Sequence, residues 1–85
     1  MKLSVTENFR IEYQRLPQVI QDQVDEKLEI FLKNERYPSL RVKKMEGTNG
    51  IWELRVNQNY RITFSRGADI YVLRRVGTHN VLRRP

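Results

Sequence analysis

The sequence predicts an α+β domain in which two N-terminal helices pack on one face of a small antiparallel sheet of about four strands. Three observations predict this class. Apolar residues recur at helical spacing between residues 9 and 32. Apolar and polar residues then alternate between residues 50 and 64. Turn-forming pairs at Asn49-Gly50 and Gly67-Ala68 delimit the strands of the second half.

The composition fits a single domain over residues 1–85, with a core that is thin for its size, because 39% of the residues are apolar and 31% are charged. No apolar run approaches the roughly 20 residues of a membrane span. The first five residues are soon followed by the charged residues Glu7 and Arg10, which is not the pattern of a signal peptide. The chain has no Cys and therefore no disulfide. We expect a cytoplasmic protein that does not bind a membrane.

The positive charge is concentrated in the second half of the chain. Residues 1–40 carry six Lys or Arg and seven Asp or Glu, whereas residues 41–85 carry ten and three. Such a skew indicates a polyanionic partner, and nucleic acid is favoured over membrane because no basic amphipathic helix accompanies it. A surface charge that only keeps the protein soluble is the alternative.

The N-terminal half predicts a strand followed by two helices. Residues 2–5 alternate in character and predict a strand at or next to the sheet edge. Thr6 is a good N-cap for the first helix, Pro17 separates it from the second, and the second is expected to end near Asn34. We expect their shared apolar stripe to pack on the sheet. It consists of Phe9, Tyr13, Leu16, Ile20, Val24, Leu28, Phe31 and Leu32.

Residues 50–64 predict a two-stranded ribbon joined by a turn at residues 57–59, around which the fold is organised. The apolar cross-strand pairs would be Val56 with Tyr60, Leu54 with Ile62 and Trp52 with Phe64. On the opposite face Arg55 lies directly across from Arg61, and Glu53 lies diagonal to Arg61. Like charges in that position destabilise a sheet. We therefore expect an anion to bind there.

The next turn extends this pattern. A two-residue Gly67-Ala68 loop would place Arg61 beside Arg74, and a loop longer by one residue would place Arg75 there instead. Residues 81–85 are expected to form a basic, solvated tail.

The chemistry that this face suggests is cleavage of RNA by its own 2′-hydroxyl. That reaction requires removal of the hydroxyl proton, stabilisation of the charged phosphorane and protonation of the 5′-oxygen. Guanidinium groups suit the second task and the imidazole of His79 suits a proton transfer. Glu53 would accept the hydroxyl proton or only pair with Arg61. A single His excludes the usual zinc sites. In the alternative interpretation, His79 is only a solvated surface residue, and Arg55 and Arg61 only lie on the solvent-exposed face of the sheet.

Three short motifs carry a family resemblance: Trp52-Glu-Leu-Arg55, Tyr60-Arg-Ile62 and Gly77-Thr-His79. In this order and spacing the chain resembles the RelE/ParE toxin superfamily over nearly its whole length. The resemblance implies two N-terminal helices on one face of an antiparallel sheet, and inhibition by a cognate antitoxin. It also implies cleavage of mRNA in the ribosomal A site without a metal or another cofactor.

The resemblance assigns roles by position. Arg61 resembles the phosphate-binding strand arginine of the family, and His79 lies where members have an arginine or histidine implicated in acid catalysis. Arg55 occupies the place of a strand lysine. The chain departs from the pattern at Glu53, which replaces a second lysine, and no tyrosine follows His79.

We therefore expect the toxin of a toxin-antitoxin system that acts as a ribosome-dependent mRNA endoribonuclease. Arg61 and Arg55 would hold the scissile phosphate, His79 would be the general acid, and Glu53 a base or an orienting residue. The residues expected to bind the RNA backbone are Lys43, Lys44, Arg74 and Arg83. The alternatives are a ParE-type poison of DNA gyrase and a non-catalytic nucleic-acid-binding member of the fold.

Overall fold

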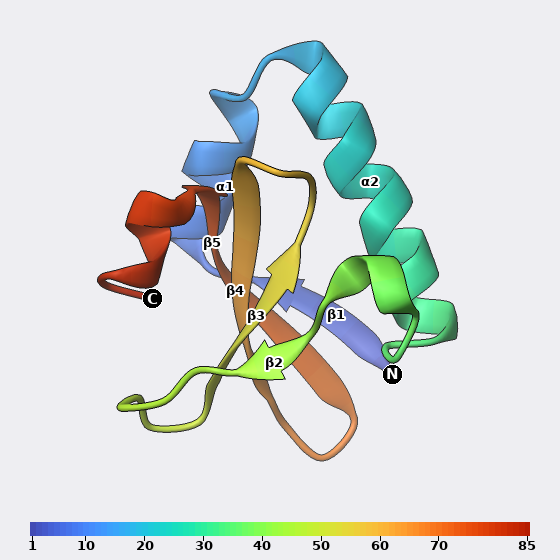
Figure 1. Cartoon of the computed structure of the whole chain (residues 1–85), viewed down its shortest axis with the longest axis vertical. Helices are drawn as coiled ribbons and strands as arrows, with labels where there is room; N and C mark the ends of the chain where they lie inside the picture. Colours follow the sequence, from blue (N-terminus) through green and yellow to red (C-terminus); the bar gives the residue numbers. More distant parts are fainter.

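The computed structural model describes residues 1–85 and places five strands in one mixed sheet (Figure 1). The elements are β1 (Lys2–Val5), α1 (Glu7–Gln14), α2 (Gln18–Lys33), the 3₁₀ turn η1 (Pro38–Leu40), β2 (Lys43–Lys44), β3 (Ile51–Arg55), β4 (Tyr60–Arg66), β5 (Ile70–Thr78) and the 3₁₀ turn η2 (His79–Leu82). The order across the sheet is β1-β5-β4-β3-β2. The α+β class is confirmed, but the sheet has five strands rather than about four, and β1 lies parallel to β5. None of the helices has the length and apolar character that a membrane span needs.

Helix α1 begins where the sequence predicts because Thr6 caps it. The Thr6 hydroxyl accepts a hydrogen bond from the Phe9 N–H at 3.1 Å. It also donates to the carbonyl oxygen of Arg74 in β5 at 2.6 Å. The cap therefore fixes the start of the helix to the sheet.

Helix α2 follows the predicted break. Pro17 is its N-cap, one position before the first helical residue, and the helix ends at Lys33 with Asn34 as its C-cap. The prediction that Leu32 packs on the sheet is wrong, since 44% of this residue is exposed. Successive helical residues are rotated by about 100°, so the turn that buries Phe31 directs Leu32 outward.

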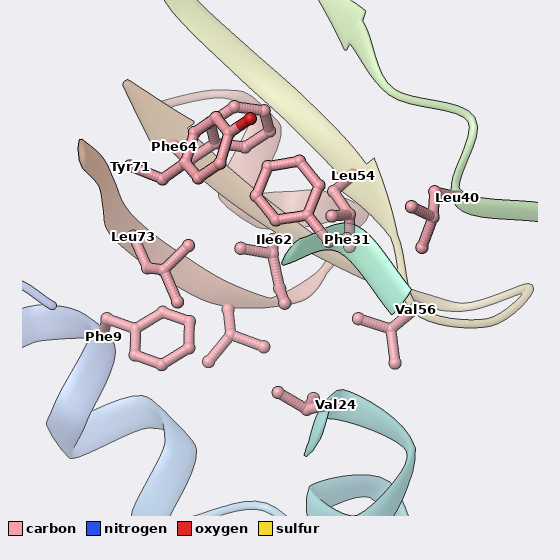
Figure 2. Packing of buried hydrophobic residues seen from close by; sticks show 11 residues of the cluster. Phe9, Val24, Phe31, Leu40, Leu54, Val56, Ile62, Phe64, Tyr71 and Leu73 are labelled. Atoms are coloured by element: carbon pink, nitrogen blue, oxygen red, sulfur yellow. The ribbon is translucent and has the colours of Figure 1, made fainter. Parts of the chain in front are cut away.

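The core lies between the two helices and the inner face of the sheet (Figure 2). Phe31 reaches from α2 onto this face, and its ring centroid lies 5.0 Å from that of Phe64 and 4.3 Å from that of Tyr71. Only 1% of Phe31 is exposed. Burial of one such side chain contributes about 1.5–3 kcal/mol, so Phe31 helps to hold α2 on the sheet.

The predicted register of β3 and β4 is confirmed, because Trp52 pairs with Phe64 and Arg55 with Arg61. The predicted register of β4 and β5 is wrong. Gly67 donates its N–H to the carbonyl oxygen of Ile70, so the turn centres on residues 68 and 69 rather than on Gly67-Ala68.

A bulge further along the same strand pair shifts the register again. Phe64 pairs with Leu73, but Thr63 pairs with Arg75, which leaves Arg74 as the extra residue. Neither Arg74 nor Arg75 therefore lies across from Arg61, whose partner is Gly77.

Residues 81–85 do not form the solvated tail that the sequence predicts. The turn η2 packs against β4 and β5 (Figure 1), and its residue Val81 is 4% exposed. Gly77 makes this approach possible, because a Cβ atom there would lie 2.8 Å from Val81 Cγ1. The main-chain oxygen of Pro85 accepts hydrogen bonds from Thr63 Oγ1 at 3.3 Å and Arg74 Nε at 3.1 Å. Part of the outer face of the sheet is therefore covered.

Candidate nucleic-acid interface

The uncovered part of the outer face contains a polar hollow of about 300 Å³, which we call the arginine hollow. Strands β2, β3 and β4 and the residue that follows η1 supply its lining. The lining residues are Arg41, Lys43, Glu53, Arg55 and Arg61. Four cations and one carboxylate therefore share a small volume that contains no apolar side chain.

The two strand arginines lie close together because they share a hydrogen-bond acceptor. Arg55 Nε donates to the carbonyl oxygen of Asn57 at 3.3 Å, and Arg61 Nη1 donates to the same oxygen at 2.7 Å. The two nitrogens are therefore at most the sum of these distances apart, 6.0 Å. Arg61 Nη1 also donates to the carbonyl oxygens of Gln58 at 3.3 Å and Tyr60 at 3.0 Å. The turn carbonyls hold both guanidinium groups at one end of the ribbon.

Asn57 is the residue that organises this turn, a role that the sequence reasoning did not assign to it beyond tolerance of the turn. Its Oδ1 accepts the N–H groups of Asn59 at 2.8 Å and Tyr60 at 2.9 Å. Its Nδ2 donates to Gln23 Oε1 of α2 at 2.6 Å. The side chain thus fixes the turn to the helix, while the carbonyl group of the same residue positions the arginines.

The charges of the hollow are not neutralised internally. The ion pairs of the chain involve the N-terminus with Asp69, Arg10 with Glu7, Arg66 with Glu35 and Arg75 with Glu12. None of these pairs includes a residue of the arginine hollow. Glu53 lies across from Lys43 and Thr63 in the sheet, without an ion pair to Arg61. A net positive charge is therefore available to an anion.

Two further predicted residues lie near the hollow without lining it. Lys44 lines an adjacent hollow of about 310 Å³ that shares Lys43 and Glu53 with the first. His79 is exposed at the start of η2 and does not line either hollow. It follows Thr78, which pairs with Tyr60 at the end of β4 that carries Arg61.

Arg74 and Arg83 lie apart from the hollow. Arg74 is the bulged residue of β5 and donates to Pro85. Arg83 is exposed at the end of η2. Arg75, the alternative neighbour of Arg61, instead binds Glu12 of α1 with Nη2 to Oε2 at 2.6 Å. This hydrogen bond raises the pKa of the Arg75 guanidinium above its ordinary value.

Arg41 lines the arginine hollow, although the sequence pattern indicates for it only a place in a short extended segment. It follows the buried Leu40 and adopts a left-handed backbone with φ 47° and ψ 46°. It is the only non-glycine residue with positive φ. An arginine after a 3₁₀ turn is an ambiguous signal, because the left-handed region favours Gly and Asn. Nothing in the sequence pattern identified it.

The fold is similar to that of toxins of known structure. A chain of the RelB-RelE antitoxin-toxin complex from Methanococcus jannaschii superposes with a TM-score of 0.75 at 20% identity, over 94% of each chain. The YoeB/ParE toxin from Agrobacterium tumefaciens superposes with a TM-score of 0.77 at 16% identity, over 93% of this chain and 99% of that one. A chain of the intact E. coli RelBE toxin-antitoxin complex superposes with a TM-score of 0.72 at 19% identity, over 91% of this chain and 94% of that one. These similarities establish the fold.

Sequence comparison identifies the family. No curated protein sequence matches the chain. A sequence model of the ParE-like toxin domain matches residues 18–81, which include both α2 and the whole antiparallel part of the sheet. The chain therefore belongs to the ParE-like toxin domain family, within the RelE/ParE toxin superfamily.

Proposed function

We propose that this chain is the toxin of a toxin-antitoxin system and acts as a metal-independent endoribonuclease on ribosome-bound mRNA. Its membership of the ParE-like toxin family supports the first part. The arginine hollow supports the second, and one observation carries it. Arg55 and Arg61 are held on a shared carbonyl oxygen with no carboxylate ion pair. Such an arrangement is electrostatically unfavourable until an anion enters.

The anion that fits two adjacent guanidinium groups is the scissile phosphate. Guanidinium groups stay charged at any physiological pH and donate two parallel hydrogen bonds to phosphate oxygens. As the phosphorane forms, one more negative charge develops on these oxygens. Donors that already point at them stabilise this state without reorganisation. Removal of one such donor typically lowers the rate by about 10²–10³-fold.

The remaining steps are proton transfers. The 2′-oxygen attacks phosphorus, the bond from phosphorus to the 5′-oxygen breaks, and the products carry a 2′,3′-cyclic phosphate and a 5′-hydroxyl. Glu53 lies in the hollow, where it would accept the 2′-hydroxyl proton or orient that group. His79 would donate the proton to the 5′-oxygen. Because His79 lies outside the hollow, the leaving nucleotide must extend toward η2 to reach it.

The basic residues around the hollow would position the RNA backbone. Lys43 and Lys44 occupy the exposed β2 edge, directly beside the hollow. We retain Arg74 and Arg83 as backbone contacts on the β5 side. An enzyme with so few catalytic groups depends on its substrate being held in place, and a ribosome would supply that positioning.

A cognate antitoxin is the proposed protein partner. The RelE toxins of M. jannaschii and E. coli were solved in complexes with RelB. We propose that an acidic antitoxin segment covers the arginine hollow, because its net positive charge would attract one. Complex formation that is insensitive to a combined Arg55→Glu and Arg61→Glu change would contradict this interface.

A ParE-type gyrase poison remains the second candidate function. Two observations favour it: the matching family model is the ParE-like domain, and His79 does not line the hollow. Such a protein would use the basic face to bind another protein rather than to cleave RNA. A non-catalytic member of the fold would bind RNA in a salt-dependent manner without arresting growth.

Mapping of mRNA ends after induction in cells distinguishes these functions. We expect new 5′ ends within translated codons, growth arrest and no gyrase-linked DNA breaks. Arg61→Gln should abolish both the ends and the arrest, while Arg15→Gln, an equal charge change on the exposed end of α1, should abolish neither. Gyrase-linked breaks with intact mRNA would overturn the nuclease assignment in favour of the gyrase poison.

A further inference from the structure

A second hollow of about 490 Å³ lies where α2 ends and the chain turns toward β2. We call it the Tyr37 hollow, and its lining includes Arg36, Tyr37, Arg41, Trp52 and Arg66. Tyr37 is 47% exposed. Its hydroxyl forms no hydrogen bond within the chain. A large aromatic ring at the rim of a hollow with both charged and apolar lining residues is therefore left free to stack on a ligand.

One wall of the Tyr37 hollow contains a paired cation and carboxylate, so this wall is locally neutral. Arg66 lies 4.2 Å above the ring centroid of Trp52 and forms an ion pair with Glu35 at 2.5 Å. The adjacent Arg66 guanidinium lowers the pKa of the Glu35 carboxyl, which keeps the pair charged. The cations that remain unpaired at the rim are Arg36 and Arg41.

Arg41 connects this hollow to the proposed cleavage site. It lines the Tyr37 hollow, the arginine hollow, and a third hollow of about 520 Å³ between α2 and the end of β3. The buried Leu40 anchors the preceding turn, and the left-handed conformation of Arg41 then directs the chain into β2. Backbone strain of this kind is typical of residues whose side chain is positioned for a ligand. The three hollows therefore share one lining residue, Arg41, whose guanidinium group forms no ion pair.

We propose that the Tyr37 hollow receives the base of a nucleotide that flanks the scissile phosphate, with Arg41 bound to the phosphate between the two hollows. This inference rests on the proposed ribonuclease function and names the class of ligand, single-stranded RNA. The combination of an exposed aromatic ring with a free guanidinium group is the one that binds single strands. Stacking on Tyr37 accepts every base, because every base has a π-face. The Tyr37 hollow would therefore increase the affinity for single-stranded RNA and fix the position of the strand relative to the arginine hollow, without a strong preference for one base.

The fluorescence of Trp52 provides the test, because it is the only tryptophan in the chain and it lines the Tyr37 hollow. The probe is a single-stranded RNA of about ten nucleotides with 2′-O-methyl groups that prevent cleavage. Small domains that bind single strands typically cover about 4–16 nucleotides, so this length suffices. We expect binding to change the Trp52 emission. Tyr37→Ala should weaken binding about 5- to 150-fold, and Tyr37→Phe, which keeps the ring, should restore it to within about twofold.

Two variants separate the hollows. Arg41→Gln should weaken binding and lower the slope of log affinity against log salt by about 0.7, the value for one phosphate contact on a single strand. Arg61→Gln should weaken binding but leave the emission change at saturation unaltered. Arg15→Gln is the charge-matched control and should bind like the parent protein.

The results distinguish this inference from the proposed function. Binding of Tyr37→Ala with the parental affinity, or no change in Trp52 emission when the RNA is bound, would overturn the inference even if the protein cleaves mRNA. Failure of the parent protein to bind the RNA at all would also overturn it. Tyr37-dependent binding by a protein that does not cleave ribosome-bound mRNA would overturn the nuclease proposal and leave the stacking site in place.

Discussion

The like-charge pair of Arg55 and Arg61 makes a quantitative prediction about stability. At 6.0 Å, the largest separation that the shared acceptor allows between the two nitrogens, two unit charges repel each other by about 0.7 kcal/mol in a medium like water, and by more where the surroundings are less polar. The shared carbonyl of Asn57 offsets part of this repulsion, so we expect a net unfavourable coupling of about 0.5–1 kcal/mol. The pair should therefore weaken the folded state until an anion binds.

A double-mutant cycle measures this coupling. Arg55→Gln, Arg61→Gln and the double variant are unfolded in urea alongside the parent protein, at about 0.05 M and about 1 M salt. The coupling should be repulsive at low salt and close to zero at high salt, where the Debye length falls to about 3 Å. The pair Arg15 and Arg61 is the control and should show no coupling in either buffer. A coupling between Arg55 and Arg61 that is zero or favourable at low salt would refute the reasoning.

Three further predictions concern packing and pH. Phe31→Ala should lower the free energy of unfolding by about 3–5 kcal/mol, measured in urea; a loss below about 1 kcal/mol would contradict its place at the centre of the core. Gly77→Ala should place a methyl group against Val81 and so expose residues 79–85 to rapid amide hydrogen exchange. Adding Val81→Ala to this variant removes the clashing methyl group of Val81 and should restore protection. Unchanged protection in Gly77→Ala would argue against the contact. Glu35→Gln should cost about 1 kcal/mol at neutral pH. Because Arg66 lowers the folded-state pKa of Glu35, this cost should disappear as the pH falls through that pKa, below the ordinary range near 4.3, and a cost that persists in acid would contradict the ion pair.

Local patterns predicted most of the fold and the centre of the site. Strict alternation on both sides of a three-residue turn leaves one register for residues 52–64, since a slip by one residue would send Trp52 and Phe64 to water. The cross-strand arginine pair followed from that register alone. The cap at Thr6 and the break at Pro17 were likewise local signals.

Features that depend on contacts between distant residues could not be predicted from local sequence patterns. The bulge at Arg74 does not change the alternation of apolar residues in the sequence. The sequence pattern therefore could not predict the resulting shift in the β4–β5 register. The parallel pairing of β1 with β5 joins residues almost 70 positions apart. The site residue Arg41 depends on a left-handed turn anchored by a buried leucine, and no short motif encodes that combination.

Single-turnover cleavage of mRNA bound to purified ribosomes tests most directly whether the arginine hollow holds a scissile phosphate. The parent protein should produce fragments that end in a 2′,3′-cyclic phosphate and begin with a 5′-hydroxyl. Arg61→Gln, with an unchanged urea midpoint or a higher one, should cleave at least about 100-fold more slowly, and Arg15→Gln should cleave at the parental rate. Cleavage by Arg61→Gln at the parental rate would contradict the account.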